Sequence, residues 1–281
     1  MYLYHADALA LGGAFTRPVQ KDIPSQAACS LPTVGGTATC QLGKTDIEGM
    51  ISFDSAQSRV TGSLDGTSCV TSSSVIIENL NILNVVIADQ VIARITARHP
   101  PKTDEQIKKC VTTEPEIITT GCHFEGLRIS GQTVQLEMDH DLFYQLPTYG
   151  RWQDEWKAKK AMRKRIEGSL MGSTLPALAP KQTEAPHLQH IRSGHKFQVS
   201  AAGLQPTVIS SFVKNSGKST MPGISAPGPI IIVPHFGTIY LGEVIVSFGQ
   251  RRVHMMRLEL GSPDEGSVTV GTTTSNGTLF P

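Results

Sequence analysis

The stretch that decides the fold reads Val75-Ile-Ile-Glu-Asn-Leu-Asn-Ile-Leu-Asn-Val-Val-Ile-Ala-Asp-Gln-Val-Ile-Ala-Arg-Ile-Thr-Ala-Arg98. Apolar and polar residues alternate along it with a period of two, which is the pattern of strands that bury one face. It predicts two strands, over 74–83 and 85–98, or one long bent strand. In the second half, Val91 and Ile95 face one way, whereas Arg94 and Arg98 face the other. We expect this polar face to carry no converging acid, base or ligand set, so that function lies in loops and strand edges.

Similar alternation predicts further strands along the chain. Ser130-Gly131 supplies the turn of one hairpin, and Gly249-Gln250-Arg251 supplies a three-residue loop in another. The tail from Gly261 is rich in Gly, Ser and Thr and is predicted to be loosely held. The remaining predicted strands lie near 8–15, at 50–53, 58–64, 127–129, 134–138, within 195–212, and at 230–233, 238–248 and 252–260.

One amphipathic helix is predicted from Trp152 to Leu170. The two tryptophans, Trp152 and Trp156, lie four residues apart, and an apolar stripe continues through Met162 and Ile166 to Leu170. The stripe is typical of a helix packed on a sheet. Basic residues cover the other faces, but acidic residues are interleaved with them, so we interpret that surface as a solvated helix face.

The fold class predicted from these patterns is mainly β, with antiparallel sandwich or barrel-like sheets and one amphipathic helix. Residues 1–150 form a β domain that contains the opening stretch. Residues 151–190 supply the helix and a Pro-rich linker, and residues 191–281 supply strands that complete the β structure.

Composition excludes several classes of protein. The chain has 281 residues, a formal net charge of +1 and only 17% charged residues. A general nucleic-acid binder usually carries a clear basic excess, so nucleic acid is not an expected partner. No run of 18 apolar residues occurs, so no transmembrane helix is predicted.

Five cysteines are present, and two pairs lie close in sequence: Cys29 with Cys40, and Cys110 with Cys122. We expect disulfides, although spacing cannot fix their connectivity, and Cys69 is left over. The N-terminal residues lack the basic region of an export signal. The protein is therefore either cytosolic or begins near a mature end, and the cysteines favour the second interpretation and an extracellular or cell-surface location.

Local motifs for chemistry are weak. His187, His190 and His195 could ligate a metal, but ordinary loop histidines are the simpler interpretation. Asp139-His140-Asp141 lacks the oxygen ligands of a calcium loop and is predicted to be a turn after a strand. Gly217-Lys-Ser-Thr220 has Phe212 where a phosphate-binding loop needs glycine. No cofactor is predicted.

The opening stretch also resembles exported bacterial proteins of the "choice-of-anchor P" family. The features that match are the lead-in Ser72-Ser-Ser74, the strand Val86–Ala93, the segment Gly126–Val134 and the upstream Cys69. The resemblance implies secretion, a β-rich domain and attachment to a cell surface, and it brings no catalytic residues.

From class and resemblance, we predict an exported structural or cell-surface β protein that assembles with itself, since strand edges readily accept a neighbouring strand. It is not expected to be an enzyme. One alternative is a module that binds carbohydrate or another surface partner, through Trp152 and Trp156 with Tyr144 and Tyr149 beside them. A second alternative is a metal-dependent enzyme.

Overall fold

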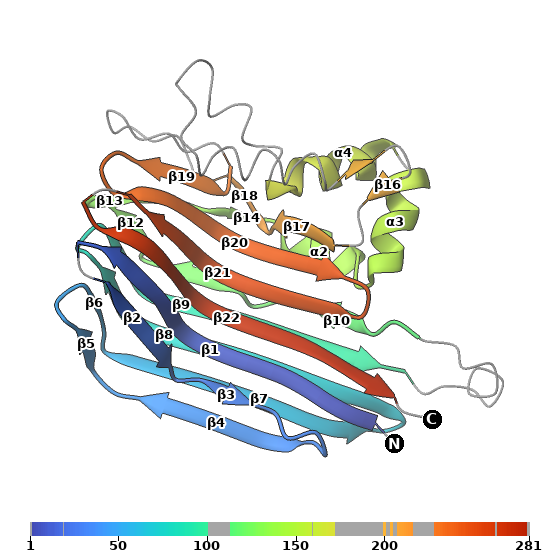
Figure 1. Cartoon of the computed structure of the whole chain (residues 1–281). Helices are drawn as coiled ribbons and strands as arrows, with labels where there is room; N and C mark the ends of the chain where they lie inside the picture. Colours follow the sequence, from blue (N-terminus) through green and yellow to red (C-terminus); the bar gives the residue numbers. More distant parts are fainter. Residues whose placement is uncertain are drawn as a thin grey trace.

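Two antiparallel sheets stack face to face, and helices lie at one end of them (Figure 1). The structure is a computed structural model that describes residues 2–18, 20–100, 113–158, 160–171, 199–200, 203–204, 207–215, 228–261 and 263–279. The predicted fold class, mainly β with antiparallel sheets in a sandwich, is confirmed.

The larger sheet has ten strands, and its main path runs β13-β12-β9-β8-β6-β5. β7 pairs with β8 and with β4, while β10 and β11 pair with β9. The strands are β4 (Gly36–Leu42), β5 (Thr45–Ile47), β6 (Ile51–Phe53), β7 (Ser55–Asp65), β8 (Ser68–Ile82), β9 (Val86–His99), β10 (Glu116–Ile118), β11 (His123–Glu125), β12 (Arg128–Ile129) and β13 (Gln132–Thr133).

The smaller sheet has eight strands, and its path runs β17-β20-β21-β22-β1-β2. β19 pairs with β20, and β3 pairs with β1. The strands are β1 (Tyr2–Arg17), β2 (Lys21–Gln26), β3 (Cys29–Ser30), β17 (Thr207–Ser211), β19 (Ile230–Val233), β20 (Gly237–Ser247), β21 (Gln250–Leu260) and β22 (Glu265–Leu279).

Two small sheets and three helices complete the described elements. The small sheets pair β14 (Glu137–Met138) with β18 (Val213–Asn215) and β15 (Val199–Ser200) with β16 (Gly203–Leu204). The predicted helix corresponds to α3 (Tyr149–Ala158) and α4 (Lys160–Ser169). A further helix, α2 (His140–Gln145), was not predicted from the sequence.

The opening stretch forms two strands rather than one. Leu83 and Asn84 both have positive φ, and the amide of Val85 donates to the carbonyl of Ile82 at 3.0 Å. This is a type I′ turn, whose twist suits an antiparallel hairpin. The side chain of Asn81 fixes it by accepting from the amide of Asn84 at 3.0 Å. The hairpin turns β8 directly back into β9.

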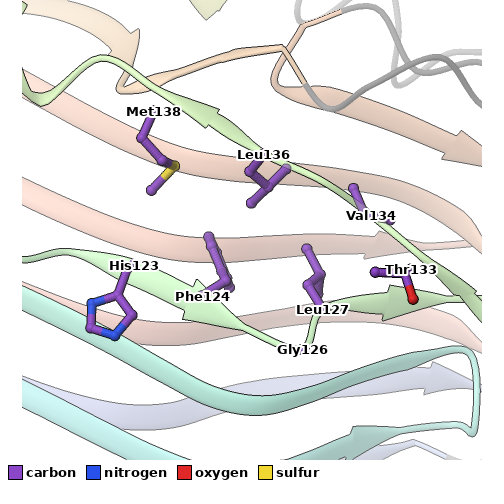
Figure 2. A pocket seen from close by; sticks show the side chains of 8 residues that line it. All are labelled: His123, Phe124, Gly126, Leu127, Thr133, Val134, Leu136 and Met138. Carbon is purple, nitrogen blue, oxygen red and sulfur yellow. The ribbon is translucent and has the colours of Figure 1, made fainter.

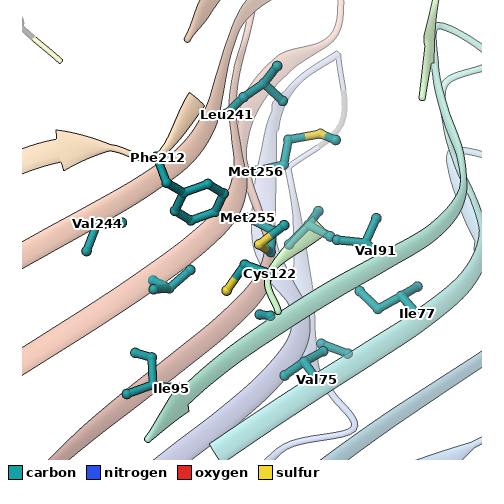
Figure 3. Close-up of a cluster of buried hydrophobic side chains, with 14 of the residues drawn as sticks. Val75, Ile77, Val91, Ile95, Cys122, Phe212, Leu241, Val244, Met255 and Met256 are labelled. Carbon is teal, nitrogen blue, oxygen red and sulfur yellow. The ribbon is translucent and has the colours of Figure 1, made fainter. Parts of the chain in front are cut away.

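Alternation along the hairpin decides which face is buried. Val75, Ile77, Val91 and Ile95 are fully buried and point into the core, where they meet side chains of the smaller sheet such as Met255 (Figure 3). Burying side chains of this size contributes about 1.5–3 kcal/mol each. The opposite face of β7, β8 and β9 is consequently the outer surface of the molecule.

The C-terminal tail is not loosely held, which corrects the prediction. β22 lies between β1 and β21 and pairs with both. Its ladder with β1 begins at Tyr2↔Leu279, and its ladder with β21 begins at Arg251↔Ser275. Val268 and Val270 are fully buried on its inner face. Farther along the strand, the buried hydroxyls of Ser275 and Thr71 lie 2.6 Å apart and link the two sheets. Small hydroxyl side chains therefore fill part of the core.

Arg251 ties the helical end to the sandwich. Its guanidinium is almost completely buried and donates to the carbonyl of Ile117 at 2.7 Å and to that of Leu146, just after α2. Burial lowers the pKa of Arg251 to about 9, so the group is still charged at neutral pH.

Glu114 stabilises the start of α3. Its carboxylate accepts from the amides of Tyr149 at 2.5 Å and Gly150 at 2.9 Å.

The position of β22 can be tested with a pair of matched substitutions on that strand. Val270→Asn places an amide in the core and removes apolar contacts, and should lower the free energy of unfolding by about 3 kcal/mol. Ser267→Asn lies on the exposed face of the same strand and should change it by less than about 0.5 kcal/mol. Urea unfolding measures both values. Two neutral substitutions would mean that the tail is loosely held after all.

Candidate functional site

The feature that stands out for interaction is an open strand edge. β4 pairs with β7 along seven consecutive residues, from Gly36↔Gly62 to Leu42↔Ala56. No strand in the described part of the chain pairs with its other side, and β4 forms the outermost strand at the bottom of the view (Figure 1). An edge of this kind presents unpaired backbone donors and acceptors that another strand can use.

The direction in which the backbone groups of β4 point can be derived from those of β9, because β7 and β8 connect the two strands in a continuous ladder. The amide of Arg94 donates to Cys122 Sγ at 3.2 Å, and the thiol donates to the Arg94 carbonyl at 3.3 Å. Both groups of Arg94 therefore point away from Ser74, its partner on β8. Antiparallel pairs alternate between hydrogen-bonded and non-bonded. Ser74 is then bonded to Arg59 on β7, and Thr39 points its backbone groups away from Arg59.

Alternation extends this result along β4. Thr37, Thr39 and Gln41 all direct their amide and carbonyl groups outward, whereas Ala38 and Cys40 direct theirs into the ladder with β7. The side chains of Thr37, Thr39 and Gln41 are exposed. Three successive pairs of backbone groups are thus available to an incoming strand.

β4 is long for an edge strand and carries no protective feature. Its sequence, Gly36-Thr-Ala-Thr-Cys-Gln-Leu42, has neither a charge nor a proline. Edge strand β2 carries Lys21 and Pro24, and β17 is bridged by Leu170 at Ser210. Edge strands β5 and β13 have only three and two residues. Charge, proline, short length and covering segments are the usual defences of an edge, and β4 lacks all of them in the described structure.

β4 is missed from the sequence, because no strand is predicted between the one near 8–15 and the one at 50–53. The signal that would have found it is the alternation of Thr37, Thr39 and Gln41 with Ala38 and Cys40. The inward side chains, Ala38 and Cys40, are small and contribute little hydrophobicity. The alternation is therefore visible only in the polar residues at the other positions.

The predicted disulfide between Cys29 and Cys40 is not formed. Both thiols are free, as are those of Cys69 and Cys122. Burial and the nearby Cys40 raise the pKa of Cys29 to about 11, so it is a neutral thiol at pH 7. Cys122 is buried, with its pKa raised to about 12, and its sulfur holds the backbone of β9. Cys110 lies outside the described residues.

The predicted binding surface on the helix is also wrong. Trp152 is fully buried and donates from Nε1 to the carbonyl of Leu146 at 3.0 Å, and Trp156 is 4% exposed. The ring of Trp152 packs against Phe143, with centroids 5.6 Å apart. The spacing that suggested exposed aromatics is the apolar stripe that anchors the helix. Of the neighbouring tyrosines, Tyr144 is 62% exposed and Tyr149 is half-buried.

The metal candidates have different outcomes. His187, His190 and His195 lie outside the described residues. Within the described part, no group of three or more His, Cys, Asp or Glu residues could hold a metal ion. Asp139 caps α2 by accepting from the amide of Leu142 at 3.2 Å, and it pairs with Arg165. Despite burial, this arginine lowers the pKa of Asp139. The carboxylate therefore joins α2 to α4.

A small hollow lies beside β11 and β12 (Figure 2). Its volume is about 130 Å³, and Phe124, Leu127, Leu136 and Met138 form its apolar walls, with His123 at one end. Pockets for substrates of ordinary size have volumes of about 300–1,000 Å³. This hollow is too small for such a ligand.

One cluster of titratable groups lies around Tyr2, at the start of β1. Tyr2 packs its ring against His99 with centroids 4.9 Å apart, and Cys69 pairs with His99 across β8 and β9. Within the described structure, the Tyr2 hydroxyl and His99 Nε2 are buried without a hydrogen-bond partner. Burial lowers the pKa of His99 to about 4 and raises that of Tyr2. Both side chains are therefore neutral at pH 7.

Comparison with known proteins identifies a family without a known activity. A family model described as "Domain of unknown function (DUF8256)" matches residues 2–247. The match ends at the last residue of β20, so β21 and β22 lie beyond it. No curated protein and no solved structure matches the chain. Among the described helices, none is long and apolar enough to cross a membrane.

Buried histidines should make the fold sensitive to acid. The pKa of His99 falls from 6.5 to about 4 on folding, so the folded state binds fewer protons between these values. The contribution is fully present above pH 6.5 and is lost as the pH falls toward 4. For His99 it amounts to about 3 kcal/mol. His254, whose pKa is also lowered to about 4, adds a second contribution in the same window.

We therefore expect the free energy of unfolding to drop between about pH 7 and about pH 4.5, and His99→Gln to flatten that drop. Urea unfolding at both pH values measures the effect. His5→Gln is the matched control, because the side chain of His5 is exposed. An equal pH dependence in wild type and His99→Gln would contradict the assignment.

Proposed function

The chain belongs to this family of unknown function, and we propose that it is an exported structural or cell-surface β protein that self-associates through β4. The observation that carries the proposal is the open, uncharged edge of β4, with its outward backbone groups at Thr37, Thr39 and Gln41. The low charge of the chain, 17% against about 25% in typical globular domains, supports it, because charged side chains are one of the usual defences of a strand edge. The likeness to choice-of-anchor P proteins remains a prediction, and the free thiols add no support for export.

A second copy of the chain fits the edge by symmetry. If two β4 strands pair in antiparallel fashion about Thr39, Thr37 of each lies opposite Gln41 of the other, and Ala38 lies opposite Cys40. Such an interface is the same on both copies, as in most homodimers. No charges oppose each other across it, because β4 carries none.

The expected affinity is modest. Three outward residues on each strand would form about six backbone hydrogen bonds, each with a net contribution of about 0.5–1.5 kcal/mol. Association also costs several kcal/mol in translational and rotational freedom. The dimer should therefore have a dissociation constant in the range of about 0.1 mM to about 1 mM, unless side chains add contacts.

The carbohydrate alternative loses its proposed site, because Trp152 and Trp156 are buried. The enzyme alternative has no cluster for a metal in the described residues. Self-association is therefore the function that the geometry supports best.

Thr39→Pro tests the proposal directly. The amide of Thr39 points away from β7, so proline removes an outward donor without breaking the ladder within the molecule. We expect the dissociation constant of the dimer to rise at least about tenfold. Sedimentation velocity at protein concentrations between about 10 µM and about 1 mM measures it. Thr39→Val is the matched control, since it keeps the amide and a β-branched side chain.

Urea unfolding of each variant establishes that Thr39→Pro is folded. A wild-type protein that stays monomeric over the whole concentration range contradicts the proposal. So does a dimer that forms equally well in Thr39→Pro and Thr39→Val.

A further inference from the structure

The outer face of the ten-stranded sheet places two arginines in one row. Arg59 of β7 lies opposite Ser74 of β8, and Ser74 lies opposite Arg94 of β9. Neighbouring strands in a sheet are about 4.8 Å apart, so the two arginine Cα atoms are separated by about 10 Å. Both side chains are exposed and stand on the same face as the serine hydroxyl between them.

A second row consists of hydroxyls alone. Two residues along each strand, Thr61 lies opposite Ser72, which lies opposite Thr96. The Ser72 and Thr96 hydroxyls are 3.2 Å apart. These two rows, with Thr120 from the loop before β11, line a hollow of about 440 Å³. Its volume falls within the range of about 300–1,000 Å³ that is usual for small-molecule sites.

The guanidinium groups in this hollow have no partner within the described structure. Neither Arg59 nor Arg94 makes a side-chain hydrogen bond or ion pair there, and no carboxylate lines the hollow. Every other arginine in the described residues has a partner: Arg17 with Glu265, Arg98 with Asp65, Arg128 with Asp89, Arg151 with Glu155, Arg163 with Glu167, Arg165 with Asp139, Arg251 with two carbonyls, Arg252 with Thr274 and Arg257 with Glu243.

The surroundings hold Arg94 in place. Gly121 has a φ of +84°, and a Cβ there would lie 3.4 Å from Arg94 Cδ, so the loop follows the arginine stem closely. The next residue, Cys122, bonds the backbone of Arg94 through its sulfur. In the described structure, the hydroxyls of Thr61 and Ser74 have no hydrogen-bond partner, and both are therefore free to donate.

We propose that this hollow binds an oxyanion, that is, the phosphate or sulfate group of a small ligand. Guanidinium groups bind such oxygens in pairs and with charge assistance. Arg59 and Arg94 would approach the anion from two sides, while Ser74 donates to it from the sheet surface. Fixed strands carry all three groups, so the backbone needs no rearrangement on binding, and only the arginine side chains lose rotamer freedom.

The lining limits the rest of the ligand. No aromatic or large apolar side chain contacts the hollow, so it offers no surface for stacking a base or the face of a sugar ring. Recognition would rest on the anionic group and on hydroxyl contacts around it. This site is separate from the β4 edge and does not depend on self-association.

Titration with small anions tests the proposal. Calorimetry or amide NMR at low ionic strength, with inorganic phosphate, inorganic sulfate and methyl phosphate as probes, should show saturable binding to one site per chain. We expect Arg59→Gln and Arg94→Gln each to weaken binding at least about tenfold, and Arg59→Lys to weaken it less, because it keeps the charge but loses the paired donors. Tighter binding of methyl phosphate than of inorganic phosphate would indicate an esterified ligand, and equal binding a free anion.

Arg98→Gln is the matched control, because Arg98 stands on the same strand but is paired with Asp65 at 2.7 Å. It should change the binding constant by less than about twofold. All three arginines are exposed, so the variants are expected to fold, and urea unfolding verifies this. The proposal is overturned if no probe saturates below about 20 mM. It is also overturned if the Arg59 and Arg94 variants bind as the wild type or if Arg98→Gln weakens binding equally.

Discussion

The pairing of the first strand with the last is the constraint on which the sandwich depends. β1 and β22 run side by side from Tyr2↔Leu279 to Arg17↔Glu265, although almost the whole chain separates them in sequence. β22 in turn carries β21 and β20, so this single ladder joins the two halves of the smaller sheet. Contacts over such separations cost loop-closure entropy before they stabilise anything, so we expect slow folding that waits until β22 is available to pair with β1.

Both proposed sites follow from the same stacking. β1, β21 and β22 cover the inner face of β7, β8 and β9, which leaves the other face of these strands to solvent. Because side chains alternate with a period of two, burial of Val75 and Ala93 commits Ser74 and Arg94 to the outer face. The chain of pairings that places Arg59 beside Ser74 also turns the amide of Thr39 outward. The register of β4, β7, β8 and β9 therefore determines both which side chains line the anion hollow and which backbone groups of β4 point outward.

The parts of the fold that sequence could predict are those whose buried face is apolar. β9, β19, β20 and β21 bury Val, Ile, Leu and Met at alternate positions, and each is predicted within two residues of its bounds. β8 is predicted from residue 74, six residues late, because Thr71 and Ser73 near its start are buried without being hydrophobic. β22 is not predicted, because Thr273, Thr274 and Ser275 are buried without being hydrophobic. The Ser275 hydroxyl is compensated across the sheets by that of Thr71, and the Thr274 hydroxyl accepts from Arg252 on the neighbouring strand. Neither partner can be recognised from the sequence of β22 alone. The tryptophans of α3 gave the correct helix, but their four-residue spacing describes a buried stripe as well as a displayed one.

The candidate sites were harder to predict, since neither is local in sequence. Arg59 and Arg94 are brought together by two successive antiparallel registers, and a slip of one residue in either would send one arginine into the core. Two exposed guanidiniums on residues whose Cα atoms are about 10 Å apart repel each other only weakly in water, so the fold tolerates them without a carboxylate. Yet the other described arginines are paired, and a near-neutral chain has enough acids to pair these as well. A position that keeps two cations and free hydroxyls on rigid strands is best accounted for by an anion that comes from outside the chain.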